Sequence, residues 1–132
     1  MSLFDSIGIA GTGATVYRKW LDTVSDNIAN MNNASPTSGD AFRERFLIAQ
    51  PASDGRGVQV GGSVLGDGAG RMVHEPNHPL ADEQGYVRYP DIDLSEQMGQ
   101  LIMAQRGYQA NLTVVDRAKT AYEAALQLGR NS

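Results

Sequence analysis

The sequence of 132 residues contains no cysteine and only two histidines. The absence of cysteine excludes disulfides, thiolate metal sites and cysteine nucleophiles. His74 and His78 leave little room for a metal site built from histidine, and no serine or threonine stands with a histidine and an acid as in a catalytic triad. We therefore expect no catalytic, cofactor-binding or metal-binding residues, and we expect that the protein is not an enzyme.

Basic charge and long apolar runs are also scarce. The chain has 11 basic and 15 acidic side chains, whereas a free-standing nucleic-acid binder is normally basic. No stretch approaches the roughly 18 apolar residues that a membrane helix needs. Residues 1–7 lack the basic leader and apolar run of a secretory signal. We expect a soluble protein that binds no nucleic acid, has no small-molecule substrate and leaves the cytoplasm, if it does, without a cleaved signal.

Glycine and charge are unevenly distributed along the chain. Seven of the 15 glycines lie between Gly55 and Gly70. Residues 36–93 hold nine acidic and five basic side chains, whereas residues 1–35 and 94–132 are nearly neutral. The length allows one domain but not two ordinary ones. We therefore predict one domain formed by residues 1–35 and 94–132, interrupted by a glycine-rich insert of strands and loops over residues 36–93.

The first segment has the heptad spacing of a long helix over residues 3–31. Its apolar residues alternate at intervals of four and three, which predicts one seam for contact with other helices. The members of this seam are Leu3, Ile7, Ala10, Ala14, Tyr17, Leu21, Val24, Ile28 and Met31. The helix should end within residues 30–36, because asparagine favours turns and Pro36 disfavours helical geometry at Ser35.

The last segment has the same spacing and predicts a second helix over residues 94–128. Asp93 and Glu96 have the spacing of a capping box, and Gly129 with the polar residues 130–132 supplies a stop. The predicted seam contains Leu94, Met98, Leu101, Tyr108, Leu112, Val115, Tyr122 and Leu126, with polar breaks at Gln105 and Lys119. A neighbouring stripe is formed by Ala104, Ala118 and Ala125. The position of the seam therefore stays open between these two stripes.

The insert contains short runs that are typical of strands. Glycine or proline clusters separate the four candidate strands, which are residues 46–49, 58–60, 63–65 and 86–89. Much of residues 66–82 shows no regular pattern. We expect this part to be irregular.

The predicted helices are too long for a compact globule. At 1.5 Å per residue they span roughly 42 and 51 Å, whereas a compact chain of this length has a diameter of about 36 Å. We therefore predict a mainly α fold with a small β and irregular insert. Its N- and C-terminal helices should pair as an elongated coiled-coil hairpin, which brings both chain termini to one end.

Both helices carry further apolar residues outside their seams. These are Phe4, Ile9, Val16, Trp20, Ile102, Met103, Val114 and Leu128. One interpretation is that they pack against the insert of the same chain. The interpretation that we favour is contact with several neighbouring subunits, because a helix that is apolar over a wide arc must be buried on several sides.

Three separate parts of the chain carry motifs that are found together, in this order, in one kind of protein. Residues 25–30, followed by Phe42 and Arg43, resemble the amino-terminal signature of flagellar rod and hook proteins. Residues 79–90 are similar to the stretch before the last helix of the proximal rod member, and residues 96–111 with 125–130 are similar to its carboxy-terminal helix. Together these three parts resemble the bacterial flagellar basal-body rod protein family. The residues that match the family motif are Asn27, Ala29, Asn30, Gln109, Ala110 and Asn111. The family usually has threonine at Asn33 and more often serine at Gly107.

The resemblance implies a structural subunit of the proximal rod, which transmits torque from motor to hook. Its terminal helices would form an inner coiled-coil layer around a central channel in the periplasm. The implied partners are the same protein, other rod proteins, the rod–ring junction protein and the flagellar type III export apparatus. The resemblance also implies terminal segments that become ordered on assembly. The alternative from another class is a small coiled-coil adaptor or export chaperone of a secretion system.

Two motifs in the insert resemble functional sites but lack the structural context that those sites require. Residues 74–78 match the H-E-x-x-H pattern of zinc proteases, which requires a helix to bring both histidines to one face. Pro76 lies inside the motif and disfavours that helix. Residues 66–71 lack the lysine and the strand–helix context of a phosphate loop. We expect residues 74–78 to be a solvent-exposed loop and residues 66–71 to be a flexible hairpin or linker.

Overall fold

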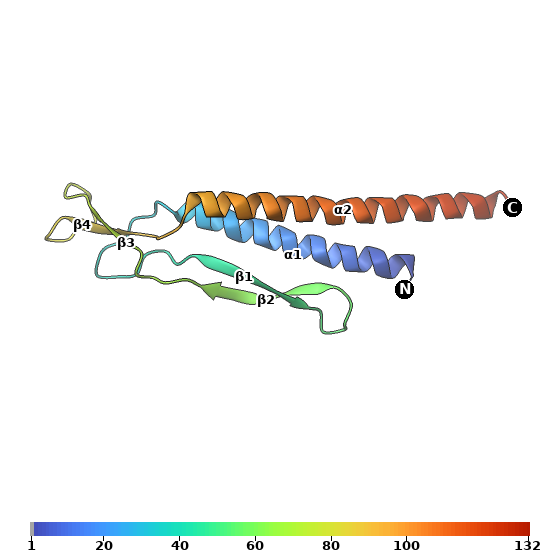
Figure 1. The fold of residues 1–132 in the computed structure, drawn as a ribbon, viewed down its shortest axis with the longest axis horizontal. Helices are drawn as coiled ribbons and strands as arrows, with labels where there is room; N and C mark the ends of the chain where they lie inside the picture. Colours follow the sequence, from blue (N-terminus) through green and yellow to red (C-terminus); the bar gives the residue numbers. More distant parts are fainter. Residues whose placement is uncertain (1) are drawn as a thin grey trace.

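The computed structural model describes residues 2–132 and is elongated and mainly helical (Figure 1). Helix α1 runs over Leu3–Asn30 and helix α2 over Leu94–Arg130. Four strands lie between them, β1 (Arg45–Pro51), β2 (Val58–Leu65), β3 (Arg71–His74) and β4 (Tyr86–Tyr89). The predicted mainly α fold with a small β insert is confirmed.

The elements form three layers along α1. Helix α2 runs antiparallel along one side of α1, and the hairpin of β1 and β2 lies along the other side (Figure 1). Among residues 2–132, the strands of this hairpin pack on α1 and not on α2. Both termini lie toward one end, where α2 extends beyond the start of α1 (Figure 1). Consequently α1 is covered on two sides, whereas α2 is covered by its own chain on one side.

Polar caps begin both helices. The Ser2 hydroxyl accepts from the backbone N–H of Asp5 at 3.1 Å, and the Asp5 carboxylate accepts from Ser2 N at 3.1 Å, which makes a full capping box. At α2 the Asp93 carboxylate accepts from Glu96 N at 3.0 Å. Helix α2 ends at Arg130, two residues after the predicted end at residue 128 and within the segment 129–132 that was predicted to stop it.

The β1–β2 hairpin is one antiparallel pair with an irregularity. The register shifts between Ile48 and Ala49, opposite Gly62, whose φ of 130° is a conformation that other residues rarely adopt. The two strand candidates predicted at 58–60 and 63–65 are therefore one bulged strand. A bulge adds a residue without ending the pairing, which is why the pair of glycines did not break the strand.

A second, smaller pair is formed by β3 and β4. Val73 lies opposite Val87, which is fully buried, and Ser35 forms a bridge to Arg88. The expectation of irregular structure over 66–82 is wrong for β3. This strand is too short for its periodicity to be recognised alone, and pairing with the predicted strand β4 defines it.

The buried core is small and partly polar. Its apolar members are mostly alanine and valine, and they are Ala10, Ala14, Val16, Val24, Ala41, Val87, Ile92 and Ala104. Asn27 and Gln97 are buried as completely as any of them. Since one chain encloses so few large apolar side chains, its internal packing supplies only part of the burial that a protein of this size normally has.

Candidate interaction interface

The predicted seam of α1 lies in the interior of the molecule. Every one of its nine residues is buried or half-buried, and Ala10, Ala14 and Val24 are the most enclosed. The chain itself therefore covers this stripe along the full length of α1.

The predicted seam of α2 is only partly enclosed. Leu101, Tyr108 and Val115 are half-buried, but the exposed members are Leu94, Met98, Leu112, Tyr122 and Leu126. The stripe that the chain covers also alternates by four and three, and it consists of Gln97, Leu101, Ala104, Tyr108, Asn111, Val115 and Ala118. The neighbouring stripe through Ala104 and Ala118 is therefore the one enclosed within the chain.

Small residues explain this choice of stripe. A Cβ atom placed on Gly13 would come within 2.5 Å of Asn111 Oδ1, and one placed on Gly107 would overlap the ring of Tyr17. Each helix therefore supplies a glycine against which a larger side chain of the other helix rests. Helices approach this closely only where side chains are small, so the larger side chains of α2 point outward.

A buried polar cluster lies where α1 ends and α2 begins, and it joins the helix pair to the insert. Asn27 Nδ2 donates to Gln97 Oε1 at 3.1 Å and to the carbonyl oxygen of Arg45 at 3.0 Å. Asn27 Oδ1 accepts from Arg45 N at 3.0 Å. Gln97 Nε2 also donates to Glu44 Oε1. These bonds satisfy the two buried amides and connect α1, α2 and the start of β1.

Glu44 belongs to the same cluster, and its surroundings shift the pKa of its carboxylate. Burial raises the pKa of Glu44 above its usual value of 4.5, while the hydrogen bond from Gln97 acts in the opposite direction. The neighbouring carboxylates of Glu96 and Asp91 raise this pKa further. At neutral pH the charged form of Glu44 is therefore held at some cost in stability.

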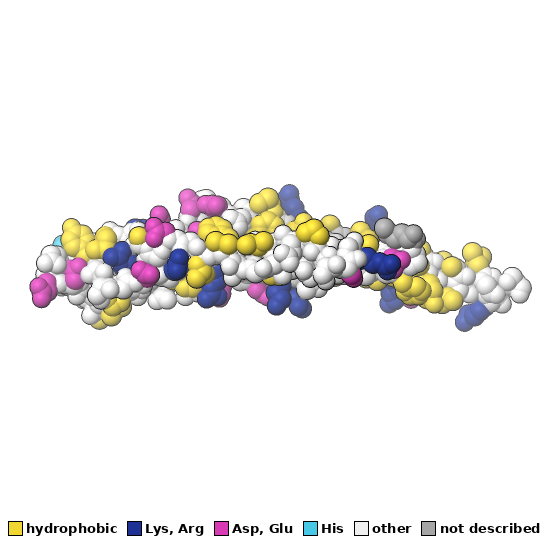
Figure 2. All heavy atoms as spheres, turned by 90° about the horizontal axis from the view of Figure 1, so that it is seen from below, with side chains coloured by type: hydrophobic (Ala, Val, Ile, Leu, Met, Phe, Trp, Pro, Cys, Tyr) yellow, Lys and Arg dark blue, Asp and Glu magenta, His cyan; other side chains and the backbone are white. Residues whose placement is uncertain are grey.

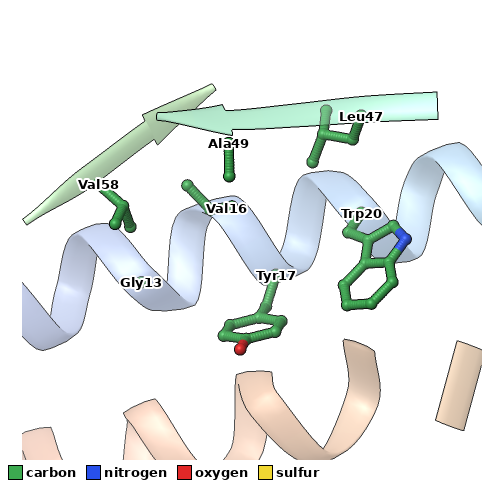
Figure 3. A pocket seen from close by; sticks show the side chains of 7 residues that line it. All are labelled: Gly13, Val16, Tyr17, Trp20, Leu47, Ala49 and Val58. Atoms are coloured by element: carbon green, nitrogen blue, oxygen red, sulfur yellow. The ribbon is translucent and has the colours of Figure 1, made fainter. Parts of the chain in front are cut away.

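An apolar groove of about 320 Å³ lies between α1 and the hairpin. Leu47, Ala49 and Val58 point from the strands toward Val16, whereas Tyr17 and Trp20 point to the other side of α1 (Figure 3). Trp20 Nε1 donates to Gln100 Oε1 of α2 at 3.3 Å. Of the two interpretations of the outer apolar residues, packing against the insert therefore holds for Val16, and Trp20 contacts α2.

The remaining outer residues differ from these two. Phe4 is 63% exposed, although its ring meets that of Tyr122 edge-on at 5.2 Å between centroids. Ile9 is half-buried. On α2 the exposed members are Ile102, Met103, Val114 and Leu128. Residues 2–132 leave about half or more of each of these α2 side chains exposed.

The six motif residues of the resemblance have different surroundings. Asn27 is at the centre of the polar cluster, and Asn111 Nδ2 donates to the Gly107 carbonyl at 2.9 Å. Asn30 Nδ2 donates to the Asp26 carbonyl at 2.8 Å. The other three are exposed, and they are Ala29, Gln109 and Ala110. Two of the six therefore have roles in packing within the chain.

Comparison with known proteins identifies the family. The family model described as flagellar basal body rod FlgEFG protein C-terminal matches residues 83–128. Over 134 aligned positions the chain is 33% identical to the flagellar basal-body rod protein FlgC of Yersinia enterocolitica, covering 98% of this chain and 100% of that protein. The chain belongs to the FlgC family.

Other FlgC proteins agree with this assignment. The protein of Borreliella burgdorferi is 31% identical over 97% of this chain and 98% of its own length. That of Bacillus subtilis is 27% identical over 98% of this chain and 100% of its own length. The relatives are rod proteins by name, and the prediction that this FlgC family member is not an enzyme agrees with them.

The H-E-x-x-H segment of this FlgC family member is not helical. His74 ends β3, where its ring meets that of Tyr86 at 4.9 Å, and His78 Nδ1 accepts from Leu80 N at 3.0 Å. No group of three or more potential metal ligands gathers among residues 2–132. Within the same range, neither helix has an apolar stretch long enough to cross a bilayer.

Sequence reasoning missed several residues that hold the FlgC-type fold together. Gln97, Glu44 and Thr12 appear in no predicted seam. Thr12 Oγ1 accepts from Val58 N at 3.2 Å and donates to the Ile9 carbonyl at 2.6 Å, which ties the hairpin to α1. Gln97 directly precedes the predicted seam residue Met98, and this position was the only signal for it in the sequence. A polar residue beside a seam is normally predicted to be exposed.

Proposed function

We propose that the protein is a structural subunit of the bacterial flagellar basal-body rod, at its proximal part, and that it transmits torque from motor to hook. The observation that carries this proposal is the identity of 33% to a basal-body rod protein over nearly the whole of both chains. The absence of a cluster of potential metal ligands among residues 2–132 is compatible with a structural role.

The two terminal segments, 1–35 and 94–132, are proposed to act as one coiled-coil domain in the inner layer of the rod. Heptad spacing on both helices and the antiparallel arrangement of α1 and α2 support this view. Residues 36–93 are proposed to form the insert that this domain carries. The packing of the β1–β2 hairpin on α1 supports a close association of this part of the insert with the helices.

The exposed apolar side chains are proposed to be the contacts with neighbouring subunits. On α1 this concerns Phe4, and on α2 it concerns Met98, Ile102, Leu112, Val114, Tyr122 and Leu126. Large exposed apolar surfaces in a protein of this size indicate interaction sites. The neighbours are proposed to be copies of this chain, other rod proteins and the rod–ring junction protein.

Export is proposed to proceed through the flagellar type III apparatus, without a cleaved signal, to a periplasmic site in the basal body. A chain without cysteine forms no wrong disulfides in an oxidising compartment. The small core supports unfolding for passage through a narrow channel. A small adaptor or export chaperone is less well supported, since the relatives that match over their full length are rod proteins.

The test is deletion of the gene in a flagellated host, followed by isolation of basal bodies. We expect cells without the protein to lack completed rods and motility, and expression of the intact chain to restore both. Mass spectrometry should find the chain in purified basal bodies from the restored strain. Normal rods in the deletion strain, or a chain that stays in the cytoplasmic fraction, would contradict the proposal and favour an adaptor.

A further inference from the structure

Helix α2 carries two neighbouring stripes with the heptad spacing, of which one is enclosed against α1 and the other points outward. Both stripes contain Leu101, Tyr108 and Val115, and they differ at four positions. In the enclosed stripe the four are Gln97, Ala104, Asn111 and Ala118. In the outward stripe they are Met98, Gln105, Leu112 and Lys119. Each set of four has two polar members, so the hydrophobic pattern alone does not decide which stripe faces α1.

The two stripes are close in space as well as in composition. Neighbouring helical residues lie about 100° apart around the axis, and the stripes share every second member, so a rotation of α2 by about 50° would exchange them. The predicted seam, to which the outward stripe belongs, continues as Leu126 on the part of α2 that extends beyond α1, where hydrophobic side chains lie at the surface (Figure 2). The orientation of α2 therefore decides which apolar side chains the molecule presents.

A buried pair of amides, Asn27 and Gln97, distinguishes the two orientations of α2. The Gln97 side chain is fully buried, and Asn27 is 1% exposed. Asn27 Nδ2 donates to Gln97 Oε1 at 3.1 Å, and Gln97 Nε2 donates to Glu44 Oε1. After a rotation, Met98 would take the place of Gln97 beside Asn27. A thioether sulfur is only a weak acceptor, so one buried amide hydrogen of Asn27 would lose its partner.

The other hydrogen bonds of Asn27 fix the direction in which it donates. Its Nδ2 also donates to the Arg45 carbonyl at 3.0 Å, and its Oδ1 accepts from Arg45 N at 3.0 Å. These two bonds hold the amide plane of Asn27 against the start of β1, so only its second hydrogen is directed to α2. A buried donor with a fixed direction requires an acceptor at one position of the facing helix. Single buried polar residues set the register of coiled coils in this way.

We propose that Asn27 and Gln97 are positioning residues that select the orientation of α2 against α1. Their hydrogen bond forms only when the enclosed stripe faces α1, and it decides between two stripes of similar hydrophobic content. As a consequence Met98 and Leu112, which are 43% and 39% exposed, point outward. The inference concerns the single chain and goes beyond the proposed function, which its failure would leave intact.

Because the chain has no cysteine, introduced disulfides can report the orientation of α2. A Cβ atom on Gly13 would lie 3.0 Å from Asn111 Cγ, so position 13 faces position 111 in the structure. Three reporters combine Gly13→Cys with Asn111→Cys, with Leu112→Cys or with Thr113→Cys. The 111 reporter detects the observed orientation and the 112 reporter the rotated one. Position 113 lies outside both stripes, so the 113 reporter detects unfolding.

Each reporter is made with Gln97 unchanged, with Gln97→Met and with the matched control Gln127→Met. Methionine has as many side-chain atoms in line as glutamine, so Gln97→Met removes the hydrogen bonds without opening a large cavity. Gln127→Met makes the same change at an exposed position outside both stripes. The reporters alter the contact at Gly13 equally in all three backgrounds. The purified full chain is oxidised briefly at low concentration, and peptide mass spectrometry measures the intrachain disulfide.

With Gln97 unchanged, and equally with Gln127→Met, we expect the 111 reporter to exceed the 112 reporter at least about tenfold, because the fold holds only the first pair of thiols at high effective concentration. With Gln97→Met we expect the yield of the 112 reporter to come within about twofold of the 111 reporter, since both orientations are then populated. The 113 reporter should stay low in all three backgrounds.

Three results would overturn the inference. If the 111 reporter keeps its full preference in Gln97→Met, the amide pair does not select the orientation. If all three reporters increase together, the pair only stabilises the fold, and α2 has separated from α1 instead of rotating. Equal yields of the 111 and 112 reporters with Gln97 unchanged would show that the chain has no single orientation for the pair to select.

Discussion

At Gly107 the backbone of α2 lies directly against the ring of Tyr17 on α1, and at Gly13 the backbone of α1 lies against Asn111. These two positions set the distance between the helices. The sequence marks Gly107 as a departure from the family, which more often has serine there. The ring of Tyr17 packs directly on the backbone of α2, and glycine fits this position because any Cβ atom would displace the tyrosine.

We predict that Gly107→Ala and Gly99→Ala have opposite effects, although both place the same residue in the same helix. Gly99→Ala should stabilise by about 1 kcal/mol, because alanine favours the helix and the added methyl group meets nothing. Gly107→Ala should destabilise by about 1 to 3 kcal/mol, because overpacking against Tyr17 outweighs that gain. Urea unfolding followed by circular dichroism measures both. Equal stabilities would contradict the close approach of α1 and α2.

Glu44 is the residue at which stability should depend on pH in an identifiable way. Burial raises its pKa above 4.5, so the folded state binds the proton more tightly than the unfolded state does. Stability from this group therefore increases as pH falls from neutral through the raised pKa. Glu44→Gln removes the charge and keeps an oxygen to accept from Gln97.

We expect Glu44→Gln to be more stable than the wild type at neutral pH, and the difference in unfolding free energy to shrink as pH falls toward 4.5. The pKa of Asp82 is lowered, chiefly by the backbone N–H of Tyr86 and then by the Thr37 hydroxyl, and it affects both proteins alike. Glu83→Gln, at an exposed position, is the matched control. A difference that does not change with pH would show that Glu44 is not penalised by burial.

At the scale of elements, local patterns located both helices to within two residues at each end. Heptad spacing and polar caps act over a few residues, so they are readable along the chain. The same reasoning found β1 and β4, divided β2 at its bulge, and missed β3. A four-residue strand such as β3 is defined by its partner rather than by its own periodicity.

The fold-back of the hairpin onto α1 was not predictable from local patterns. It depends on contacts between residues far apart in the chain, such as Thr12 with Val58 at 3.2 Å and Asp5 with Arg56 at 3.1 Å. The Arg56–Asp5 pair is exposed and contributes little by itself. Leu47 and Val58 point toward the buried Val16 across the groove, and removing this apolar surface from water favours this position of the hairpin.

At the scale of the whole molecule, a long and thin subunit encloses little apolar surface. Helices α1 and α2 have 28 and 37 residues, but the part of α2 beyond Tyr122 has no buried or half-buried residue. Isolated helices of this kind derive most of their stability from packing. Burial between subunits would therefore supply the stability that the single chain lacks.

We predict that the purified monomer at low concentration has less helix than these 28 and 37 residues represent, and that the helical signal increases on assembly with other rod proteins. Circular dichroism at 222 nm across a dilution series measures the monomer, and sedimentation defines its oligomeric state. A full helical signal with cooperative melting in a strictly monomeric sample would refute the coupling of folding to assembly.

Spacing, caps and motif order predict the two long helices, the glycine-rich insert between them and the family, because these signals are carried by residues near one another in the chain. The stripe of α2 that faces α1 could not be predicted in this way, because both stripes have the same heptad spacing. The choice depends on tertiary contacts, in which Asn111 and Tyr17 rest directly on the backbone at Gly13 and Gly107. The same is true of Asn27 and Gln97, which are polar in sequence and buried in the fold, because their hydrogen-bond partners come from three separate segments.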